Sequence, residues 1–302
     1  MASLYRRFLE EALRRTFGLW QFLGFHVTPN HFYQPIPDTR RLPEALWTRR
    51  SGMVGVDLRE PAQLALLDEL SAACGSEWAE LPDAPTGVRW QFHFGNVFFE
   101  SVDAEIYWGL VRTRRPRRIV EIGSGSSTYL AAQAALRNAA EGHPCELVAV
   151  EPYPNPVLSR GFPGLTRLVT AELQSVPLEE FTALGDGDVL FIDSSHVLRI
   201  GSDVQYEFLE ILPRLRPGVL VHVHDVFLPD EYPRGWVMDE HRFWNEQYLL
   251  QAFLAFNQAF EVVWAGSYLN GRHPDRLAAA IPSYRDGETT PGSFWMRRVP
   301  TT

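Results

Sequence analysis

The chain has 302 residues and a formal net charge of −9 at pH 7, and all 28 of its basic residues are arginine. This length is enough for one large domain, or for one domain with an appendage. The acidic balance argues against nonspecific nucleic-acid binding, and the absence of lysine excludes mechanisms that need one, such as Schiff-base formation. The composition therefore predicts a soluble protein with no nucleic-acid partner.

Cysteine usage and hydropathy bear on the cellular compartment. Cys74 and Cys145 lie far apart and form neither a metal-binding pattern nor a disulfide framework. No run of about 18 apolar residues is present, so no membrane-spanning helix is expected. The first 20 residues carry arginines among acids and lack a cleavage site, unlike a signal peptide. These features predict a cytoplasmic protein without a membrane partner.

Residues 1–100 differ in pattern from the rest of the chain. Amphipathic helical segments at 4–20 and 61–74 are separated by an aromatic stretch rich in proline. We expect 1–100 to form a cap or lid on a core domain, residues 101–302. The N-terminal helices could also pair with those of a second chain, which would give a homodimer.

From residue 118 onward, apolar runs alternate with helical segments, which is typical of a parallel α/β sheet. The clearest helix is predicted at 204–215, and a later one at 242–257. Two later runs, 260–268 and 293–299, predict an antiparallel hairpin across a polar turn region. The expected fold is a Rossmann-like α/β sheet of seven strands, with this hairpin following five parallel strands at 118–122, 146–151, 166–170, 188–193 and 219–224.

Residues 119–128 read Ile-Val-Glu-Ile-Gly-Ser-Gly-Ser-Ser-Thr, a strand followed by a glycine turn and a helix. Glycines let a ligand approach the backbone, and a helix N-terminus presents unpaired N–H groups. A dinucleotide site has a third glycine, as G-x-G-x-x-G, but Thr128 holds that place. Glu121 would repel a pyrophosphate and suits a cationic group instead. The turn therefore predicts a nucleotide-like ligand that carries positive charge.

An acidic residue ends or follows each predicted parallel strand, which is where ligands bind in open α/β sheets. Glu151 follows the glycine turn at a spacing suited to a ribose diol. Asp193 ends the fourth strand, and Asp225 follows the fifth. Glu172 taken singly is better explained as a loop charge or a helix cap. The acids together favour a ligand with cationic groups.

This ordered set resembles the class I S-adenosylmethionine-dependent methyltransferases. More narrowly, residues 32–38, Phe191-Ile-Asp-Ser-Ser-His196 and His224-Asp-Val-Phe227 resemble a bacterial small-molecule group, methyltransferase family 24. The resemblance covers about residues 20–299. It implies S-adenosylmethionine as cofactor and methyl transfer to an oxygen or nitrogen atom of a small-molecule acceptor, of the kind made in secondary metabolism.

The resemblance also implies roles for individual residues. The two glycines of the turn would lie under the methionine part of the cofactor, and Glu121 would face its ammonium group or the solvated surroundings of that group. Glu151 would hold the ribose hydroxyls, Glu172 with its neighbour would flank the adenine, and Asp193 would lie near the sulfonium. The expected cofactor-binding residues are Glu121, Gly123, Ser124, Gly125, Ser127, Thr128, Glu151, Pro152, Glu172, Leu173, Asp193 and Ser194.

Methyl transfer needs a nucleophile in line with the methyl group, and often a base that removes its proton. The candidates for catalysis are His196, His224 and Asp225. Alternation along the fifth strand places His222 and His224 on one face, with His222 deeper and expected to be a hydrogen-bonded core histidine. His196 and His224 are equal candidates for the base, because histidine titrates near neutral pH.

A metal site is the competing interpretation of the same residues. Asp193, His224 and Asp225 match the places where catechol-type methyltransferases, which the arrangement also resembles, hold Mg²⁺. A histidine with two carboxylates suits Mn²⁺, Fe²⁺ or Zn²⁺ better. A site without metal, in which Asp225 caps a loop, is somewhat favoured. The alternative reaction is a cyclisation or another group transfer from the sulfonium, with or without a metal.

Acceptor contacts are expected from the region before the first core strand and from the loop after the fifth. Asp103 and Tyr107 lie one helical turn apart on one face, although packing of the cap explains them equally well. The expected acceptor-binding residues are Asn96, Asp103, Tyr107, Tyr232 and Trp236.

Overall fold

The computed structural model describes residues 2–300 and divides into two compact units. The smaller unit comprises Met1–Arg49 and Pro233–Phe243, and the larger comprises Arg50–Tyr232 and Trp244–Thr302. Helices α1 (Ala2–Phe22) and α8 (Arg234–Met238) belong to the smaller unit, as do 3-10 turns at Thr39–Arg41 and Glu44–Thr48. The first boundary between the two units along the chain falls at residue 49. The cap at 1–100 and the core at 101–302 stay a prediction.

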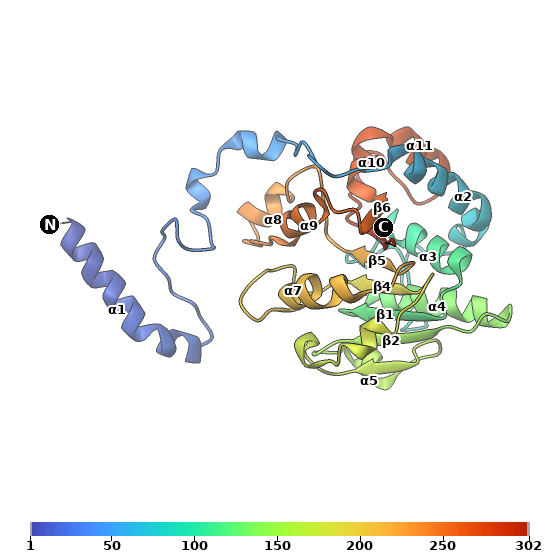
Figure 1. The fold of residues 1–302 in the computed structure, drawn as a ribbon, viewed down its shortest axis with the longest axis horizontal. Helices are drawn as coiled ribbons and strands as arrows, with labels where there is room; N and C mark the ends of the chain where they lie inside the picture. The colour runs from blue at the N-terminus through green and yellow to red at the C-terminus, as the bar shows by residue number, and fades with distance from the viewer. Residues whose placement is uncertain (1, 301–302) are drawn as a thin grey trace. The chain divides into compact units, whose positions relative to one another are not determined.

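The larger unit is built on a seven-stranded sheet of order β3-β2-β1-β4-β5-β7-β6 (Figure 1). Neighbours from β3 to β5 pair in parallel, whereas β7 is antiparallel to both β5 and β6. This order confirms the predicted fold, five parallel strands and a terminal antiparallel hairpin. The strands are β1 (Arg118–Ile122), β2 (Glu146–Val150), β3 (Arg167–Val169), β4 (Val189–Ile192), β5 (Leu220–Val223), β6 (Phe260–Ala265) and β7 (Phe294–Arg298).

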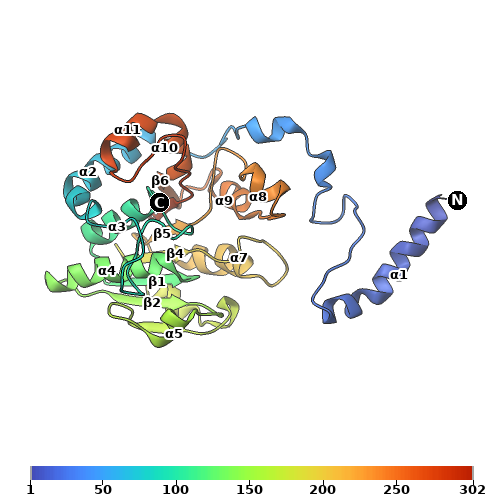
Figure 2. The ribbon, with the colours of Figure 1, turned by 180° about the vertical axis from the view of Figure 1, so that it is seen from behind.

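Helices cover both faces of the sheet (Figure 1, Figure 2). The strands are short apolar runs whose alternate side chains point to opposite faces, so each face needs its own cover. One face packs against α2 (Glu60–Trp78), α3 (Asp103–Arg114) and α4 (Ser126–Ala140), and the other against the helical stretch 203–214 and α9 (Glu246–Leu254). The shorter helices are α5 (Pro156–Arg160), α6 (Glu179–Thr182), α7 (Asp203–Tyr206), α10 (Gly266–Arg272) and α11 (Pro274–Ala280).

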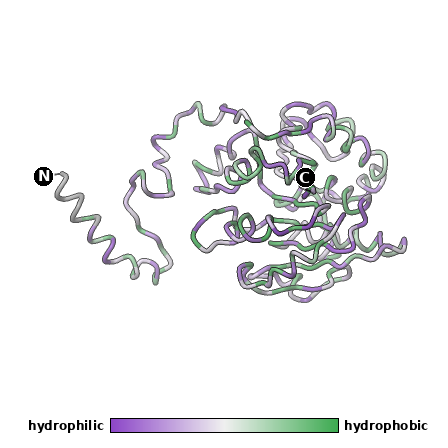
Figure 3. The backbone as a smooth tube through the Cα atoms, viewed as in Figure 1, coloured by the Kyte–Doolittle hydropathy of each residue, from purple (hydrophilic) through white to green (hydrophobic). Residues whose placement is uncertain are grey.

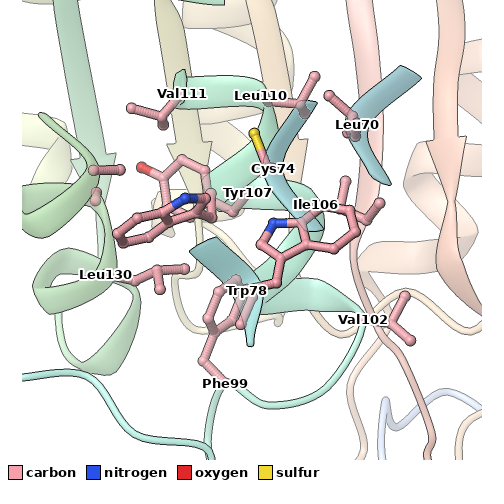
Figure 4. Packing of buried hydrophobic residues seen from close by; sticks show 14 of the residues in the cluster. Leu70, Cys74, Trp78, Phe99, Val102, Ile106, Tyr107, Leu110, Val111 and Leu130 are labelled. Atoms are coloured by element: carbon pink, nitrogen blue, oxygen red, sulfur yellow. The ribbon is translucent and has the colours of Figure 1, made fainter. Parts of the chain in front are cut away.

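The core on the first face is dominated by large side chains of α2 and α3. Trp78, Ile106 and Tyr107 are at most 1% exposed, and Figure 4 shows them packed together with Leu130 of α4. Burial of one such side chain stabilises the fold by roughly 1.5–3 kcal/mol. This packing fixes α3 against β1 and β4, and thereby sets the sheet edge on which the site is built.

Two predicted elements differ in detail from the structure. The helix expected at 204–215 consists of α7, a π-helical turn Glu207–Ile211 and a 3-10 turn Leu212–Arg214. Pro213 has no N–H, so the regular hydrogen-bond ladder cannot continue through it. The polar turn region expected between the last two strands contains α10 and α11, which contribute Leu269 and Leu277 to the core.

Hydropathy is mixed along the described chain. Hydrophilic and hydrophobic residues alternate along the outer helices and loops (Figure 3). Among residues 2–300, no helix combines the length and the apolar character that crossing a bilayer requires.

Candidate active site

A pocket of about 400 Å³ lies at the carboxyl ends of β1, β2 and β4. Seven of the expected cofactor residues line it, namely Gly123, Glu151, Pro152, Glu172, Leu173, Asp193 and Ser194. Tyr153, Gln174 and Arg199 also line it, although the sequence patterns did not single them out. The pocket lies where ligands bind in open α/β sheets, next to β1, at which the strand order reverses.

The glycine turn is shaped by the close approach of two loops. Gly123 has φ +76°, and a Cβ added to it would lie 1.8 Å from the carbonyl oxygen of Asp193. Its N–H donates to the carbonyl of Val150 at 3.0 Å. A side chain cannot fit there, so glycine is what allows the turn after β1 to lie against the loop after β4.

Glu151 closes the pocket beside this turn. Its Oε2 accepts a hydrogen bond from the Ser124 N–H at 3.2 Å, and its Oε1 accepts one from the Tyr153 N–H at 2.7 Å. The two bonds fix the carboxylate at the end of β2, half-buried on the pocket wall. A carboxylate held in this way can accept further hydrogen bonds from a diol.

Glu121 does not line the pocket, in contrast to its expected contact with a cofactor ammonium group. Its side chain is fully buried and accepts a hydrogen bond from the Tyr107 hydroxyl at 2.9 Å. Burial raises the pKa of Glu121 to about 8, against the opposing effect of hydrogen bonds with Thr128 and Tyr107. Glu121 therefore supports the glycine turn from beneath, and Tyr107 is its partner in the core.

The other expected residues of the turn are structural or lie at the edge of the pocket. Thr128 is buried, and its Oγ1 accepts a hydrogen bond from the Gly125 N–H at 3.0 Å, which starts α4. Ser127 is also buried, and Ser124 contributes its backbone to Glu151. A Cβ on Gly125 would have no protein atom within 4 Å, so open space lies above this residue.

His196 is the centre of a cluster of carboxylates, of which Glu246 is buried and Asp193 and Asp225 are partly exposed. Its Nε2 lies 3.3 Å from Oδ1 of Asp193 and 3.6 Å from Oδ2 of Asp225, and its Nδ1 lies 2.9 Å from Oε2 of Glu246. Burial alone would lower the pKa of His196, but its hydrogen bonds to Asp193 and Glu246 raise it well above its ordinary value. His196 therefore joins the loops after β4 and β5.

The second candidate histidine lies close by, on β5 and its loop. His224 is 5% exposed, and its Nε2 lies 3.3 Å from the Phe98 carbonyl and 3.8 Å from Oδ1 of Asp225. Burial opposes protonation of His224, but Asp225, Asp193 and Asp103 together raise its pKa. Its partner on the same face, His222, is fully buried and hydrogen-bonded to Ser293 at 2.9 Å.

Asp193, His196 and Asp225 could together hold a metal ion, since one ligand atom from each lies within 4.8 Å of the others. This set differs from the expected one because His196 takes the place of His224. The difference follows from geometry, since the loop after β4 folds back over the sheet edge and brings Nε2 of His196 between the two carboxylates.

The expected acceptor-binding residues are held in structural contacts. Asn96 uses its amide locally, donating to the carbonyls of His93 and Phe99 and accepting from Phe98 N–H and Phe99 N–H. Asp103 is buried and accepts hydrogen bonds from Gly292 N–H at 2.8 Å and Ser293 N–H at 3.0 Å.

The remaining two acceptor candidates follow β5. Tyr232 is 3% exposed, and its hydroxyl accepts a hydrogen bond from Gln247 N–H at 3.1 Å. Trp236 lies on α8 in the smaller unit, where the Arg242 guanidinium lies 4.7 Å from the centre of its ring. Neither position was predicted to have these contacts.

Glu246 is the buried residue of the cluster that sequence reasoning missed. It lies in the first turn of α9, 50 residues beyond its partner His196, in a helix with no recognisable motif. The one available signal was an acidic residue in the apolar stretch 242–257, the segment predicted as a helix.

The comparisons with known proteins agree with this geometry. Residues 120–226 match a family described as a methyltransferase domain. An uncharacterized protein of Archaeoglobus fulgidus is 32% identical over 170 residues, which cover 54% of this chain and 75% of that protein. The strand order of the sheet and the position of the pocket at the strand ends are those of a Rossmann-like methyltransferase fold. The chain belongs to the class I S-adenosylmethionine-dependent methyltransferases.

Solved structures give weaker similarities. An O-methyltransferase from Bacillus cereus, in complex with S-adenosylhomocysteine (SAH), is 15% identical with a TM-score of 0.36, over 78% of this chain and 91% of that one. A CmcI structure described with Mg and S-adenosylmethionine is 18% identical with a TM-score of 0.37, over 74% and 84% of the two chains. Both TM-scores lie below 0.5, so neither similarity indicates the acceptor or the metal.

Proposed function

We propose that this enzyme transfers a methyl group from S-adenosylmethionine to an oxygen or nitrogen atom of a small-molecule acceptor, with His196 beside the reacting atoms. The observation that supports this proposal is that Asp193 both lines the pocket and contacts His196. One carboxylate thus connects the cofactor pocket to the candidate base. A carboxylate-lined pocket also complements the sulfonium and ammonium charges of the cofactor.

Each residue of the pocket has a role that follows from its position. The cofactor, when bound, supplies an electrophilic methyl group on its sulfonium. Glu151, fixed by two backbone N–H groups, accepts hydrogen bonds from the ribose diol, and the glycine turn leaves room for the methionine part. His196, with Nδ1 held by Glu246, directs Nε2 toward Asp193 and Asp225, and in its neutral form it would receive the proton that the acceptor loses.

A metal-assisted version uses the same residues. Asp193, His196 and Asp225 offer two carboxylates and one imidazole, and the Nδ1 contact with Glu246 is the carboxylate support that metal-bound histidines usually have. This donor set fits Mn²⁺, Fe²⁺ or Zn²⁺, and a bound ion would lower the pKa of an acceptor hydroxyl. The same cluster would then position the acceptor oxygen rather than take its proton.

Calorimetry with S-adenosylmethionine and SAH tests the proposal. We expect both to bind the wild type, and Asp193→Asn to weaken both. Mass spectrometry of reactions with a panel of phenols, catechols and amines should show the mass gain of one methyl group on an acceptor. Binding of neither compound would refute the proposal. Loss of a fragment, or ring closure without methylation, would instead support the alternative group-transfer reaction.

The metal version is decided in the same assays. Adding Mn²⁺ or Zn²⁺ to chelator-treated enzyme should restore turnover if the metal-assisted route operates. Turnover that is indifferent to both chelator and metal would leave His196 as the base.

A further inference from the structure

We propose that Glu246 is the positioning residue for His196, holding the imidazole so that Nε2 faces Asp193 and Asp225. This inference rests on the proposed function, because it concerns the histidine placed beside the reacting atoms. Glu246 is 1% exposed and does not line the cofactor pocket, so it acts through His196.

The side-chain contact assigns the two ring nitrogens of His196. Nδ1 lies 2.9 Å from Oε2 of Glu246. Carboxylates only accept hydrogen bonds, and both ring nitrogens face one, but Glu246 at 2.9 Å is nearer to Nδ1 than Asp193 at 3.3 Å is to Nε2. We therefore assign the proton of the neutral ring to Nδ1. Nε2 is the nitrogen directed at Asp193 and Asp225, and it would serve equally as a base or as a metal ligand.

Backbone contacts from the same turn hold His196 in an unusual conformation. His196 has φ +59°, in the left-handed region that a residue with a side chain seldom adopts. Its carbonyl accepts hydrogen bonds from the N–H groups of Asn245 at 3.1 Å and Glu246 at 3.2 Å. The Asn245 side-chain oxygen accepts a third bond, from Leu198 N–H at 2.6 Å. These bonds offset the local backbone strain.

The next residue in the turn extends the support to the loop after β5. Gln247 is fully buried, and its side-chain oxygen accepts a hydrogen bond from Phe227 N–H at 3.0 Å. Its own N–H donates to the Tyr232 hydroxyl at 3.1 Å. Residues 245–247 therefore fix both loops that carry the cluster, one with His196 and one with Asp225.

An aromatic side chain completes the setting of the imidazole. The ring centres of Trp244 and His196 are 4.4 Å apart, with the planes tilted by 38°. Trp244 restricts the ring through contact, but it cannot choose between the two nitrogens of the imidazole. That choice depends on Glu246, the acceptor that faces Nδ1.

The test compares Glu246→Leu, which removes the acceptor, with Glu246→Gln, whose amide oxygen can still accept from Nδ1. Glu210→Gln, at a partly exposed position on the π-helical turn, is the matched control. The first readout is nitrogen-15 NMR of labelled histidine at alkaline pH, which shows the ring nitrogen that carries the proton. We expect Nδ1 in the wild type, in Glu246→Gln and in the control, and a mixture of both tautomers in Glu246→Leu.

The second readout is kinetic, with an acceptor that the wild type methylates. We expect Glu246→Leu to lower kcat by about 10- to 100-fold, the usual effect of losing the support of a functional histidine, while Glu246→Gln recovers most of it. Affinity for SAH, measured by calorimetry, should stay at the wild-type value in all variants.

Two outcomes would overturn the inference. One is a wild-type tautomer in folded Glu246→Leu. The other is a kcat in that variant no lower than in the control. If Glu246→Leu does not fold, Asn245→Ala and Glu246→Gln provide the comparison, and equal activity loss in both would indicate a purely structural turn. If the wild type methylates nothing, the proposed function fails, and the NMR result still decides the role of Glu246.

Discussion

The backbone of Gly123 lies so close to Asp193 that a Cβ on the glycine would be 1.8 Å from the aspartate carbonyl oxygen. This contact joins the turn after β1 to the loop after β4, the two segments that meet at the pocket. The first prediction follows from it.

Gly123→Ala should destabilise the protein and abolish measurable SAH binding. The positive φ alone costs of order 1–3 kcal/mol for a residue with a side chain, and the overlap with Asp193 adds to this cost. Thermal unfolding and calorimetry check the two effects. Gly125→Ala is the control for stability, because its φ is −175° and no protein atom lies within 4 Å of the added Cβ. Equal melting temperatures for the two variants would contradict the prediction.

Glu121→Gln should change how stability depends on pH. Burial raises the pKa of Glu121 from 4.5 to about 8, so the folded state keeps a proton that the unfolded state loses. The stabilisation is complete below pH 4.5 and is lost as the pH rises through about 8. Glutamine cannot ionise and still accepts from Tyr107. In urea unfolding, the free energy of unfolding of the variant should therefore rise relative to that of the wild type as the pH is raised to 9. Curves of stability against pH that stay parallel would refute this.

Glu151→Ala should weaken binding of S-adenosylmethionine by about 10- to 100-fold, the effect of losing hydrogen bonds to a charged group. The two backbone N–H groups that now bond to Glu151 would also lose their acceptor. Glu172→Ala, at an exposed carboxylate on the same pocket, should have a smaller effect. Calorimetry measures both. An equal loss in the two variants would argue against the ribose role of Glu151.

Asp103→Asn distinguishes a structural role from an acceptor-binding role. Asp103 now accepts hydrogen bonds from the N–H groups of Gly292 and Ser293. In the variant, the NH₂ group of the asparagine would face one of these two donors. We expect the free energy of unfolding to fall by about 1–3 kcal/mol, the cost of one buried donor left unsatisfied. The KM for the acceptor should not change. A raised KM at unchanged stability would restore the acceptor-binding interpretation.

The sequence predicts the sheet and the pocket better than it predicts the cluster around His196. Apolar runs identify the strands, and parallel strands bring their carboxyl ends to one edge, so Glu151 and Asp193 could be placed from their positions alone. His196 and His224 could not be ranked, because both follow strands at the same edge. Their difference depends on Glu246, which reaches His196 only through tertiary packing of α9.

The direction of a side chain was also beyond the sequence at Glu121. Its place before the glycine turn suggested a ligand contact, but residues along a strand alternate between faces. Glu121 faces α3 and not the pocket, and it accepts a hydrogen bond from the Tyr107 hydroxyl. The sequence of one strand does not show to which face of the sheet its acidic side chain points. That depends on which helix packs on each face.

The turn formed by residues 245–247 lies outside residues 120–226, the stretch that matches the methyltransferase-domain family. Every residue that lines the cofactor pocket falls between 122 and 203, inside the matched stretch 120–226, whereas Glu246 and its two neighbours fall beyond it. Cofactor use and orientation of the imidazole are thus encoded in separate parts of one chain. Substitutions around residue 246 should accordingly alter the orientation of the imidazole while the pocket between residues 122 and 203 stays the same.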